Sequence, residues 1–496
     1  MQIFGEPISA AAGIFLLFAL FLALSFEFVN GFHDTANAVA TVIYTHSLKP
    51  NIAVVWSGCW NLIGVLQSSG GVAFGVLALL PVELVLNVGS GAGFAMVFAL
   101  LLAAIIWNLG TWYLGLPASS SHALIGSILG VGLANSLLVG GREFGDGVNW
   151  AKASEVGISL LVSPIVGFVL AGLLLLLSKL LIKNPALYAA PSKDEPPPLW
   201  IRTLLIFTCT GVSFAHGSND GQKGMGLVML ILIGILPMTF AVDLGTSQAS
   251  IEELGAAAQT ISSQMDRHAP GIAMAGQQAA ADELSAYLKT KGQATDRTFA
   301  AIGTKCREIE TILEGKKQLT ELNGETRREL RSDLYLTAES LGKLVKQHKL
   351  EDPAEKDAAS TLKNRMDKVT KFIPVWVKIA VALALGLGTM IGWKRIVVTV
   401  GEKIGKTHLT YGQGASAELV AMGTIMAADH FNLPVSTTHV LSSGVAGTMA
   451  ANHSGLQMDT LRNLLLAWVL TLPVTVLLGA GIFGFGLNIL FRFGVK

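Results

Sequence analysis

The sequence predicts an all-α polytopic membrane protein with one soluble helical insert, and three observations support this fold class. Of 496 residues, 51% are hydrophobic and only 14% are charged, whereas an average soluble domain has about 25% charged residues. The mean hydropathy is +0.56. The charges are also concentrated, because residues 242–371 hold 19 of the 35 Lys and Arg residues and 20 of the 34 Asp and Glu residues. These figures exclude a soluble globular protein and a disordered chain.

Several function classes are disfavoured by what the sequence lacks. The net charge is +1 and no basic tract stands out, so we expect no nucleic-acid partner. The three cysteines form no CxxC motif, which argues against a disulfide framework and a cysteine zinc site. No HExxH, Walker A or GxSxG motif is present. We therefore expect a protein that is not an enzyme and has no cofactor and no resident metal.

Apolar segments long enough to cross about 30 Å of hydrocarbon recur along the chain. Two further segments, 117–138 and 434–450, begin at a proline and are rich in Ser, Thr and Gly, which is typical of re-entrant or half helices. Together they predict about 10–12 transmembrane or re-entrant helices. No Lys or Arg precedes the first apolar run, so we expect it to be a retained membrane helix. The apolar segments are 9–30, 51–80, 93–114, 156–182, 203–241, 373–393, 413–430 and 461–490.

The chain divides into five parts by composition. A Pro-rich connector at 184–200 and the charged stretch at 242–371 interrupt the apolar sequence. Within the charged stretch, apolar residues at helical spacing predict a small amphipathic helical domain. The predicted parts are membrane repeat 1 (1–150), a connecting helix and Pro-rich linker (151–200), the start of membrane repeat 2 (201–241), the soluble helical insert (242–371) and the remainder of repeat 2 with a C-terminal helix (372–496).

Two short motifs each occur twice and indicate an internal duplication. GFHDTANA at 31–38 pairs with GSNDGQKG at 217–224, and PASSSH at 117–122 pairs with PVSTTH at 434–439. From Asp34 to Pro117 is 83 residues and from Asp220 to Pro434 is 214, a difference of 131. The insert at 242–371 is 130 residues long, so removing it makes the two spacings nearly equal. Duplicated apolar halves interrupted by Gly and Pro are typical of inverted-repeat secondary transporters, which bind substrate near the membrane midplane.

The proline motifs predict an anion site. Proline is favoured at the first turn of a helix, and the free backbone N–H groups there attract anions. Two such helix ends, related by pseudo-two-fold symmetry, can hold a tetrahedral oxyanion from both sides. An alternative is that the hydroxyls only cap helices or bond to their own backbone. The candidate substrate-binding hydroxyls are those of Ser119, Ser120, Ser121, Ser436, Thr437 and Thr438.

The aspartate motifs predict coupling to a cation. Asp34 and Asp220 lie in apolar stretches, where an ionisable residue is costly and is a functional candidate by default. A carboxylate repels an anion unless it holds a cation or a proton, and cation binding then favours anion binding. Asn37 and Asn219 can supply neutral oxygen ligands. Simple bonding between neighbouring helices remains the alternative for these groups.

Three further ionisable residues are candidates. Lys223 lies where the first repeat has Asn37, and it can pair with Asp220 or attract the anion. His33, beside Asp34, is the best placed histidine for carrying a proton. Glu418 lies in an otherwise uncharged predicted helix and is a cation or proton candidate.

The segments GFHDTANAVATVIYT, FAHGSNDGQKGMG, GLPASSSH and LPVSTTHVLSS resemble the inorganic phosphate transporter (PiT) family, most of all the low-affinity transporters of Gram-negative bacteria. The resemblance covers nearly all of the membrane portion. It implies a multi-pass protein of the bacterial inner membrane, in contact with lipid and dimeric, that moves inorganic phosphate and metal-phosphate complexes by symport. A divalent metal would then be part of the substrate. Carried over by motif, Asp34, Asn37, Asn219 and Asp220 would serve coupling and the transport path, and the hydroxyls named above would bind phosphate.

Two departures from the family pattern bear on the coupling ion. Sodium-coupled relatives usually have Asn where this chain has His33, and some have Glu near Asn61. Both changes remove potential sodium ligands, so the sequence favours protons over sodium. Sodium-coupled symport, transport of sulfate or another oxyanion in the same fold, and an uncoupled anion channel stay open as alternatives.

The basic residues also predict an orientation. Lys179, Lys183 and Arg202 beside the connector, and Lys394 and Arg395 further on, favour the cytoplasmic side. The insert is then periplasmic if 203–241 is one crossing, and cytoplasmic if it is two.

Overall fold

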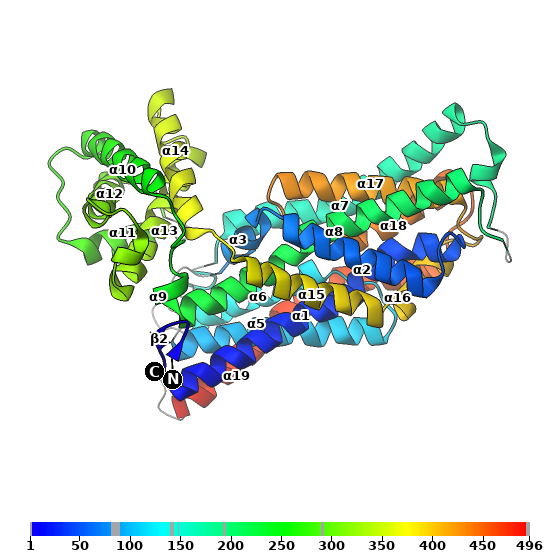
Figure 1. The fold of residues 1–496 in the computed structure, drawn as a ribbon, viewed down its shortest axis with the longest axis horizontal. Coiled ribbons are helices and arrows are strands. Elements are labelled where there is room, and N and C mark those ends of the chain that lie inside the picture. The colour runs from blue at the N-terminus through cyan, green and yellow to red at the C-terminus, as the bar shows by residue number, and fades with distance from the viewer. Residues whose placement is uncertain are drawn as a thin grey trace.

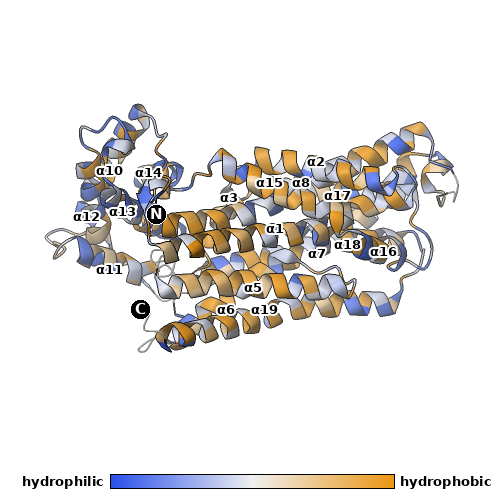
Figure 2. Ribbon diagram, turned by 60° about the horizontal axis from the view of Figure 1, so that its bottom comes forward, coloured by the Kyte–Doolittle hydropathy of each residue, from blue (hydrophilic) through white to orange (hydrophobic). Residues whose placement is uncertain are grey.

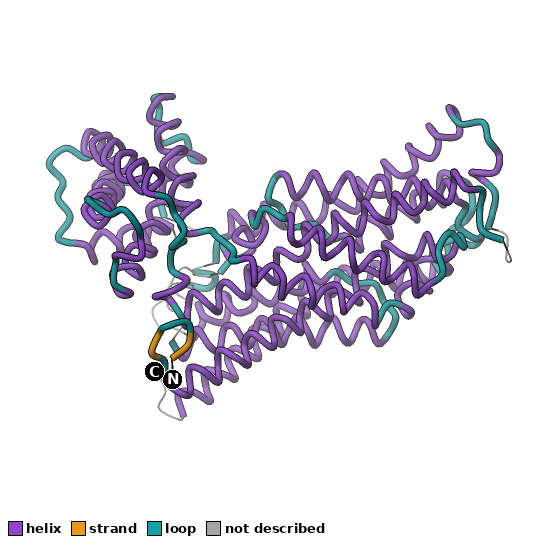
Figure 3. The backbone as a smooth tube through the Cα atoms, viewed as in Figure 1, coloured by secondary structure: helices purple, strands orange, loops and turns teal. Residues whose placement is uncertain are grey.

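The computed structural model describes residues 2–80, 90–138, 143–146, 148–191, 195–288 and 292–492, except for the side chains of residues 35–37. Figure 1 shows a bundle of long helices with a separate group of shorter helices at one end. Figure 3 shows that helix accounts for nearly all of the described backbone. The expected all-α fold with a helical insert is confirmed.

The bundle consists of two sets of helices that precede and follow the insert. Those before it are α1 (Ala10–Tyr44), α2 (Pro50–Gln67), α3 (Gly71–Leu77), α5 (Gly91–Tyr113), α6 (Ser120–Leu138), α7 (Trp150–Leu181), α8 (Leu199–Ile235) and the short α9 (Pro237–Phe240). Those after it are α15 (Val375–Ile391), α16 (Lys394–Glu402), α17 (Tyr411–His430), α18 (Thr437–Ala451) and α19 (Met458–Arg492). A 3₁₀ turn, Pro185–Tyr188, lies in the connector.

Long apolar helices predominate in the bundle. Among the described residues, six helices are long and apolar enough to cross a membrane, or up to eight if each of two bent helix pairs is one span. One bent pair is α2 with α3, at 78°. The segment expected at 203–241 comprises most of α8, a continuous helix of 37 residues that ends at Ile235, and the short α9 that follows it. The connector before α8 and the insert after it therefore lie at opposite ends of the bundle, as Figure 1 shows.

The helices of the bundle are largely hydrophobic, as the colouring of Figure 2 shows, and many of their large apolar side chains are exposed. Leu161 and Leu181 of α7 are 70% and 71% exposed, and Leu477 of α19 is 72% exposed. Contiguous exposure of large aliphatic side chains is unfavourable in water and is expected where lipid is the solvent. The chain is a multi-pass membrane protein.

The insert has a hydrophobic core of its own, formed by residues between Val242 and Val369. Its helices show the amphipathic pattern expected of a small soluble bundle. They are α10 (Gln248–His268), α11 (Gln277–Leu288), α12 (Asp296–Leu313), α13 (Gly324–Lys346) and α14 (Pro353–Thr370), with a 3₁₀ turn at Leu319–Glu321. A two-stranded hairpin of β1 (Gln2–Ile3) and β2 (Glu6–Pro7) begins the chain nearby.

The two aspartate motifs lie on helices that run in opposite directions. In Figure 1, α1 runs away from the end that carries the insert and α8 runs toward it. Each crosses another helix at glycine. A Cβ on Gly31 of α1 would lie 2.1 Å from the Leu385 carbonyl oxygen of α15, and one on Gly217 of α8 would lie 2.1 Å from the Asn61 carbonyl oxygen of α2. Only a residue without a Cβ permits such approaches, which are typical of membrane helix packing.

Candidate functional site

The two proline motifs begin α6 and α18, and their first hydroxyls cap these helices in the same way. The Ser119 hydroxyl oxygen accepts from the His122 backbone N–H at 3.2 Å, and the Ser436 oxygen accepts from the His439 N–H at 3.2 Å. This is the role of a serine at a helix N-cap. Ser119 and Ser436, predicted to bind substrate, therefore already accept from their own helices, and their hydroxyl protons remain as donors.

The next hydroxyls of both half helices converge on one carboxylate. Asp34 of α1 is buried. Its Oδ2 accepts from the Ser120 hydroxyl at 2.5 Å, and its Oδ1 accepts from the Thr438 hydroxyl at 2.5 Å. Segments more than 300 residues apart in sequence thus meet at Asp34. The donors that we expected to hold an anion hold the carboxylate of Asp34 here.

The second aspartate has a cation of its own. Lys223 and Asp220 are both buried in α8, and Lys223 Nζ lies 2.9 Å from Asp220 Oδ1. The same ammonium donates to the Ser121 hydroxyl of α6 at 2.5 Å. Of the two roles left open for Lys223, pairing with Asp220 is thus observed, and the contact with Ser121 also places its charge beside a half-helix N-terminus. His216 Nε2 lies 3.4 Å from Asp220 Oδ2.

The two aspartates are close enough to share a cation. One ligand atom from each of Asp34, His216 and Asp220 lies within 4.8 Å of the others, and all three residues are buried. With neutral histidines, the two carboxylates and the Lys223 ammonium give a net charge of −1. Carboxylate oxygens suit hard monovalent or divalent cations, and the histidine adds a proton acceptor. The cluster can hold one cation or one proton.

The other predicted residues have more varied surroundings. His33 contacts Asp34 Oδ1 through Nδ1 at 3.4 Å and Thr111 of α5 through Nε2 at 3.1 Å. Asn219 donates to the Leu433 carbonyl at 3.1 Å, and its side-chain oxygen accepts from the Val435 N–H at 3.4 Å. Asn219 thus fixes the loop before α18, and among the described residues these two bonds go to backbone groups and not to a carboxylate.

Two predicted site residues, Thr437 and Glu418, are not among the side chains that hydrogen-bond Asp34 in the described structure. The Thr437 hydroxyl is buried without a hydrogen-bond partner among the described residues. Glu418 of α17 accepts a hydrogen bond from Thr208 of α8. Thr208 precedes Asp220 by twelve residues, which is about 18 Å along a helix. Glu418 therefore lies well away from the cluster, toward the connector end. The side chain of Asn37 lies outside the described residues.

The sequence analysis missed Asn30 and Asp429. Asn30 is buried, accepts from the Ser120 hydroxyl at 2.7 Å and donates to Glu27 at 3.3 Å. It lies one helical turn before Asp34, so the i, i+4 rule identifies it as a neighbour. Asp429 accepts from Ser218 at 2.7 Å and from Gln222 at 2.6 Å, which joins α8 to α17.

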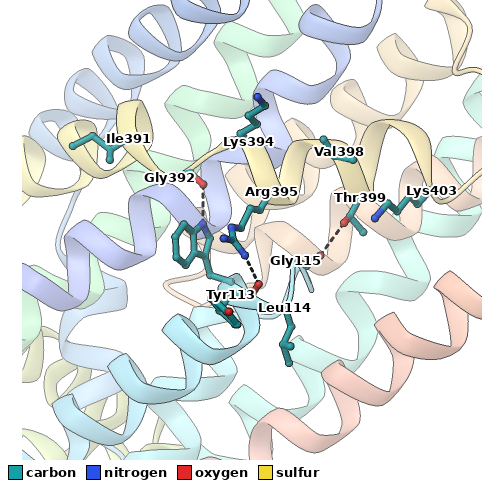
Figure 4. Close-up of a pocket in the computed structure, with 11 residues that line it drawn as sticks. Tyr113, Leu114, Gly115, Ile391, Gly392, Lys394, Arg395, Val398, Thr399 and Lys403 are labelled. Atoms are coloured by element: carbon teal, nitrogen blue, oxygen red, sulfur yellow. Dashed lines mark hydrogen bonds between the residues drawn. The ribbon is translucent and has the colours of Figure 1, made fainter.

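A basic cleft of about 500 Å³ opens at the connector end, where the chain approaches the first proline motif (Figure 4). Lys394, Arg395 and Lys403 line it, and its described lining contains no acidic side chain. Arg395 donates to the Tyr113 carbonyl at 2.6 Å, and Thr399 donates to the Gly115 carbonyl at 2.8 Å. The cleft therefore borders the loop that enters α6.

Comparison with known proteins gives a consistent result. Residues 30–479 match the phosphate transporter family. The chain is 42% identical over 493 residues to the low-affinity inorganic phosphate transporter PitA of Escherichia coli K12, covering 96% of this chain and 98% of that protein. It is 29% identical over 479 residues to a probable low-affinity inorganic phosphate transporter of Bacillus subtilis, covering 96% and 98%.

Among solved structures, a sodium-dependent phosphate transporter matches 95% of this chain and 98% of its own, with a TM-score of 0.50 and 17% identity. That likeness concerns the fold alone. All of these relatives are named as transporters, which agrees with the expectation that the chain is not an enzyme.

Proposed function

Because the chain belongs to the phosphate transporter family, we propose that it takes up inorganic phosphate with low affinity across the bacterial inner membrane. Protons drive this uptake by symport. Neutral metal-phosphate complexes are a second form of the substrate, so a divalent metal takes part as cargo and not as a resident cofactor.

The contact of Asp34 with hydroxyls from both half helices is the observation that carries this proposal. Ser120 and Thr438 lie at helix N-termini, which attract anions. The Asp34 carboxylate is itself an anion, so it competes with phosphate for these hydroxyls. A proton or cation on Asp34 removes its charge and releases the hydroxyls to phosphate. Cation binding and phosphate binding then favour one another, which is the thermodynamic basis of symport.

The charge of the site supports a single coupling ion. Lys223 neutralises one of the two carboxylates, which leaves a net charge of −1 on the cluster. One proton on Asp34 brings the cluster to neutrality. His33 and His216 touch the carboxylates, and an imidazole ring can accept a proton at one nitrogen while it donates from the other. These contacts, together with the loss of the sodium ligands noted above, favour a proton over sodium.

The test is uptake of radiolabelled phosphate into proteoliposomes under a proton gradient or a sodium gradient, with excess sulfate as competitor. We expect uptake that the proton gradient alone drives and that sulfate does not block, because sulfate has no proton to donate to a carboxylate. Uptake that requires sodium would overturn proton coupling. Inhibition by sulfate would move the function to another oxyanion, and uptake without any gradient coupling would indicate a channel.

Asp34→Asn separates coupling from binding. The variant cannot hold a proton or cation at this position, so net uptake should fall at least about tenfold. Exchange of internal for external phosphate needs no net cation movement and should persist. Asp34→Glu is the matched control that keeps the charge. Normal net uptake by Asp34→Asn would refute the role of Asp34.

We also propose that the protein is a homodimer, as the family resemblance implies. Light scattering of the purified protein in detergent distinguishes this from a monomer of 52.2 kDa. A protein mass of one chain would reject the dimer.

A further inference from the structure

The insert and the membrane bundle enclose a cavity of about 860 Å³. Its walls come from α13 and α14 of the insert and from the break between α2 and α3, the start of α7 and the loop after α17. A contact of 3.7 Å between Lys346 of α13 and Glu155 of α7 joins the two sides. The cavity is therefore a space between two modules and lies at the end of the bundle opposite the connector.

The walls of this cavity are basic. Among the described residues, three acidic side chains line it, Glu155, Glu339 and Asp367, and they face twice as many lysines, so this described lining carries a net charge of +3. The lysines are Lys152, Lys343, Lys346, Lys363, Lys368 and Lys371.

The acidic groups of the cavity are largely engaged by some of its lysines. Asp367 lies 2.5 Å from Lys363 and 2.8 Å from Lys371. Lys152 lies 2.8 Å from Glu155. The described lysines still outnumber these acids, and Lys343, Lys346 and Lys368 add their charges to the lining, Lys343 while it donates to the Tyr287 carbonyl and Lys346 while it faces Glu155.

This basic lining is not a property of the insert as a whole. Residues 242–371 contain 19 basic and 20 acidic residues, a net charge of −1. The described residues of the insert contribute five lysines and two acids to the cavity, a net charge of +3 against −1 for the insert as a whole. Its positive charge is thus gathered on the side that faces the bundle.

The cavity leads toward the candidate site. Phe431 and Asn432 line it, and Asn432 packs directly on Gly71, where a Cβ would lie 1.6 Å from its side-chain oxygen. The next residue, Leu433, is held by Asn219, and two residues later the Val435 carbonyl accepts from Ser121. A loop of a few residues therefore separates the cavity from the Lys223 contact. At the opposite end of the bundle, the basic cleft described above borders the loop that precedes α6, just as this cavity borders the loop that precedes α18.

We infer that this cavity is an entry chamber in which the insert collects phosphate from the uptake side before it reaches Asp34 and Lys223. The inference rests on the proposed function. A cleft whose walls carry a net charge of one sign attracts counter-ions and raises their local concentration and entry rate, by about 10- to 1,000-fold where all the charges have that sign. The volume exceeds that of a single tetrahedral anion, and lysine is a strongly hydrated point charge, so the chamber collects hydrated phosphate without binding it tightly.

The test compares two triple variants in cells without other phosphate uptake systems. Lys343→Gln, Lys346→Gln and Lys368→Gln remove three charges from the chamber. Lys317→Gln, Lys349→Gln and Lys356→Gln remove three charges from exposed positions of the insert outside it. The KM and maximal rate of inorganic phosphate uptake are measured at low and at physiological ionic strength, with constant osmolarity.

The chamber variant should raise KM about three- to tenfold at low ionic strength and leave the maximal rate unchanged. The wild-type KM should rise with ionic strength, because the Debye length falls from about 30 Å at 0.01 M to about 8 Å at 0.15 M, and the chamber variant should lose most of this dependence. The control variant should behave as wild type. If the chamber variant does not reach the membrane, the single variant Lys368→Gln, changed at an exposed position, is measured in its place. Its KM should rise in the same direction but by less.

Equal KM values for wild type and chamber variant, or equal shifts in both triple variants, would overturn the chamber and leave the proposed function intact. Absence of phosphate uptake by the wild type would instead overturn the proposed function. A phospholipid headgroup offers the same chemistry as phosphate. If purified protein retained anionic lipid through these lysines and KM did not change, the chamber would be a lipid site and the inference would be wrong.

Discussion

At the scale of single residues, the two halves of the repeat differ most at the aspartate motifs, which form the candidate site. Asp34 and Asp220 occupy matching positions, yet Asp34 binds hydroxyls of both half helices whereas Asp220 binds Lys223. Three residues after each aspartate, the first repeat has Asn37 and the second has Lys223. The lysine is a cation that cannot leave the site, so under the proposed coupling only Asp34 depends on a mobile cation.

Lys223→Gln should therefore change the cation requirement. The cluster would carry a net charge of −2, and phosphate should bind more weakly, with KM raised roughly tenfold, because an unpaired buried carboxylate repels it. External sodium should partly restore uptake by taking the place of the ammonium. Lys223→Arg keeps the charge and should need no sodium. Unchanged KM and no response to sodium in Lys223→Gln would contradict the role of a fixed cation.

Asp333 in the insert gives a prediction about pH. Burial raises the pKa of this carboxyl to about 6, although Lys305 lies 2.8 Å away and opposes the shift. The folded chain thus binds this proton more tightly than the unfolded chain, whose pKa is near 3.8. The proton on Asp333 therefore adds at most about 3 kcal/mol to the free energy of unfolding. This contribution is complete below about pH 4 and is lost as the pH rises through about 6.

The difference in stability between wild type and Asp333→Asn should follow this pH dependence. Cys306 of α12 is buried, so its labelling by a thiol reagent under denaturant reports opening of the insert once Cys59 and Cys209 are replaced. Rates are normalised to the denatured chain at each pH. Asp266→Asn, at an exposed position, is the control. If the labelling ratio between wild type and Asp333→Asn is constant from pH 4 to 7, the proposed linkage is absent.

At the scale of helices, close crossings position the site. Gly31 and Gly388 form the crossing of α1 with α15, where each added Cβ would lie about 2 Å from a backbone oxygen of the other helix. Gly64 and Gly217 form the matching crossing of α2 with α8. His216, next to Gly217, contacts Asn61 at 2.8 Å, so this crossing also orients a cluster residue.

Gly217→Ala should force α2 and α8 apart and displace His216. We expect a loss of about 1–3 kcal/mol in stability, as for an overpacked core, and phosphate uptake reduced at least tenfold. Gly423→Ala in α17 is the matched control, because nothing lies within 4 Å of its added Cβ. Thermal unfolding and uptake check both effects. Equal uptake by the two variants would show that the crossing does not matter for transport.

At the scale of the whole molecule, the continuous helix α8 separates the basic connector from the insert. The connector end carries Lys183, Arg202, Lys394 and Arg395, so the positive-inside rule predicts that this end is cytoplasmic and that the insert is outside. A cysteine at position 317, exposed in the insert, should react in intact cells with a membrane-impermeant maleimide. A cysteine at position 183 should react only after permeabilisation, in a background without the native cysteines. The reverse pattern would invert the orientation and remove the entry chamber from the uptake side.

Much of this molecule follows from the sequence, but the side-chain arrangement does not. The equal spacing of the repeated motifs, once the insert is removed, predicts that Asp34, Asp220 and the two proline motifs are related, and they do meet. Which hydroxyl faces which partner depends on rotamers and on neighbouring helices. Ser119 and Ser436 therefore cap their own helices, and Glu418 of α17 bonds Thr208 of α8, far from Asp220, because helix packing in three dimensions decides both.

The ion pair of Lys223 with Asp220 also bears on how far phosphate can be accumulated. A lysine that stays with the protein contributes no net charge to each transport cycle, so under the proposed coupling of one proton to one monovalent phosphate the cargo would be electroneutral. The membrane voltage then does no work on it, and only the pH difference does. Each pH unit would support about a tenfold concentration ratio. A transporter of this design equilibrates phosphate with the proton gradient and cannot concentrate it much further, which suits surroundings where phosphate is plentiful.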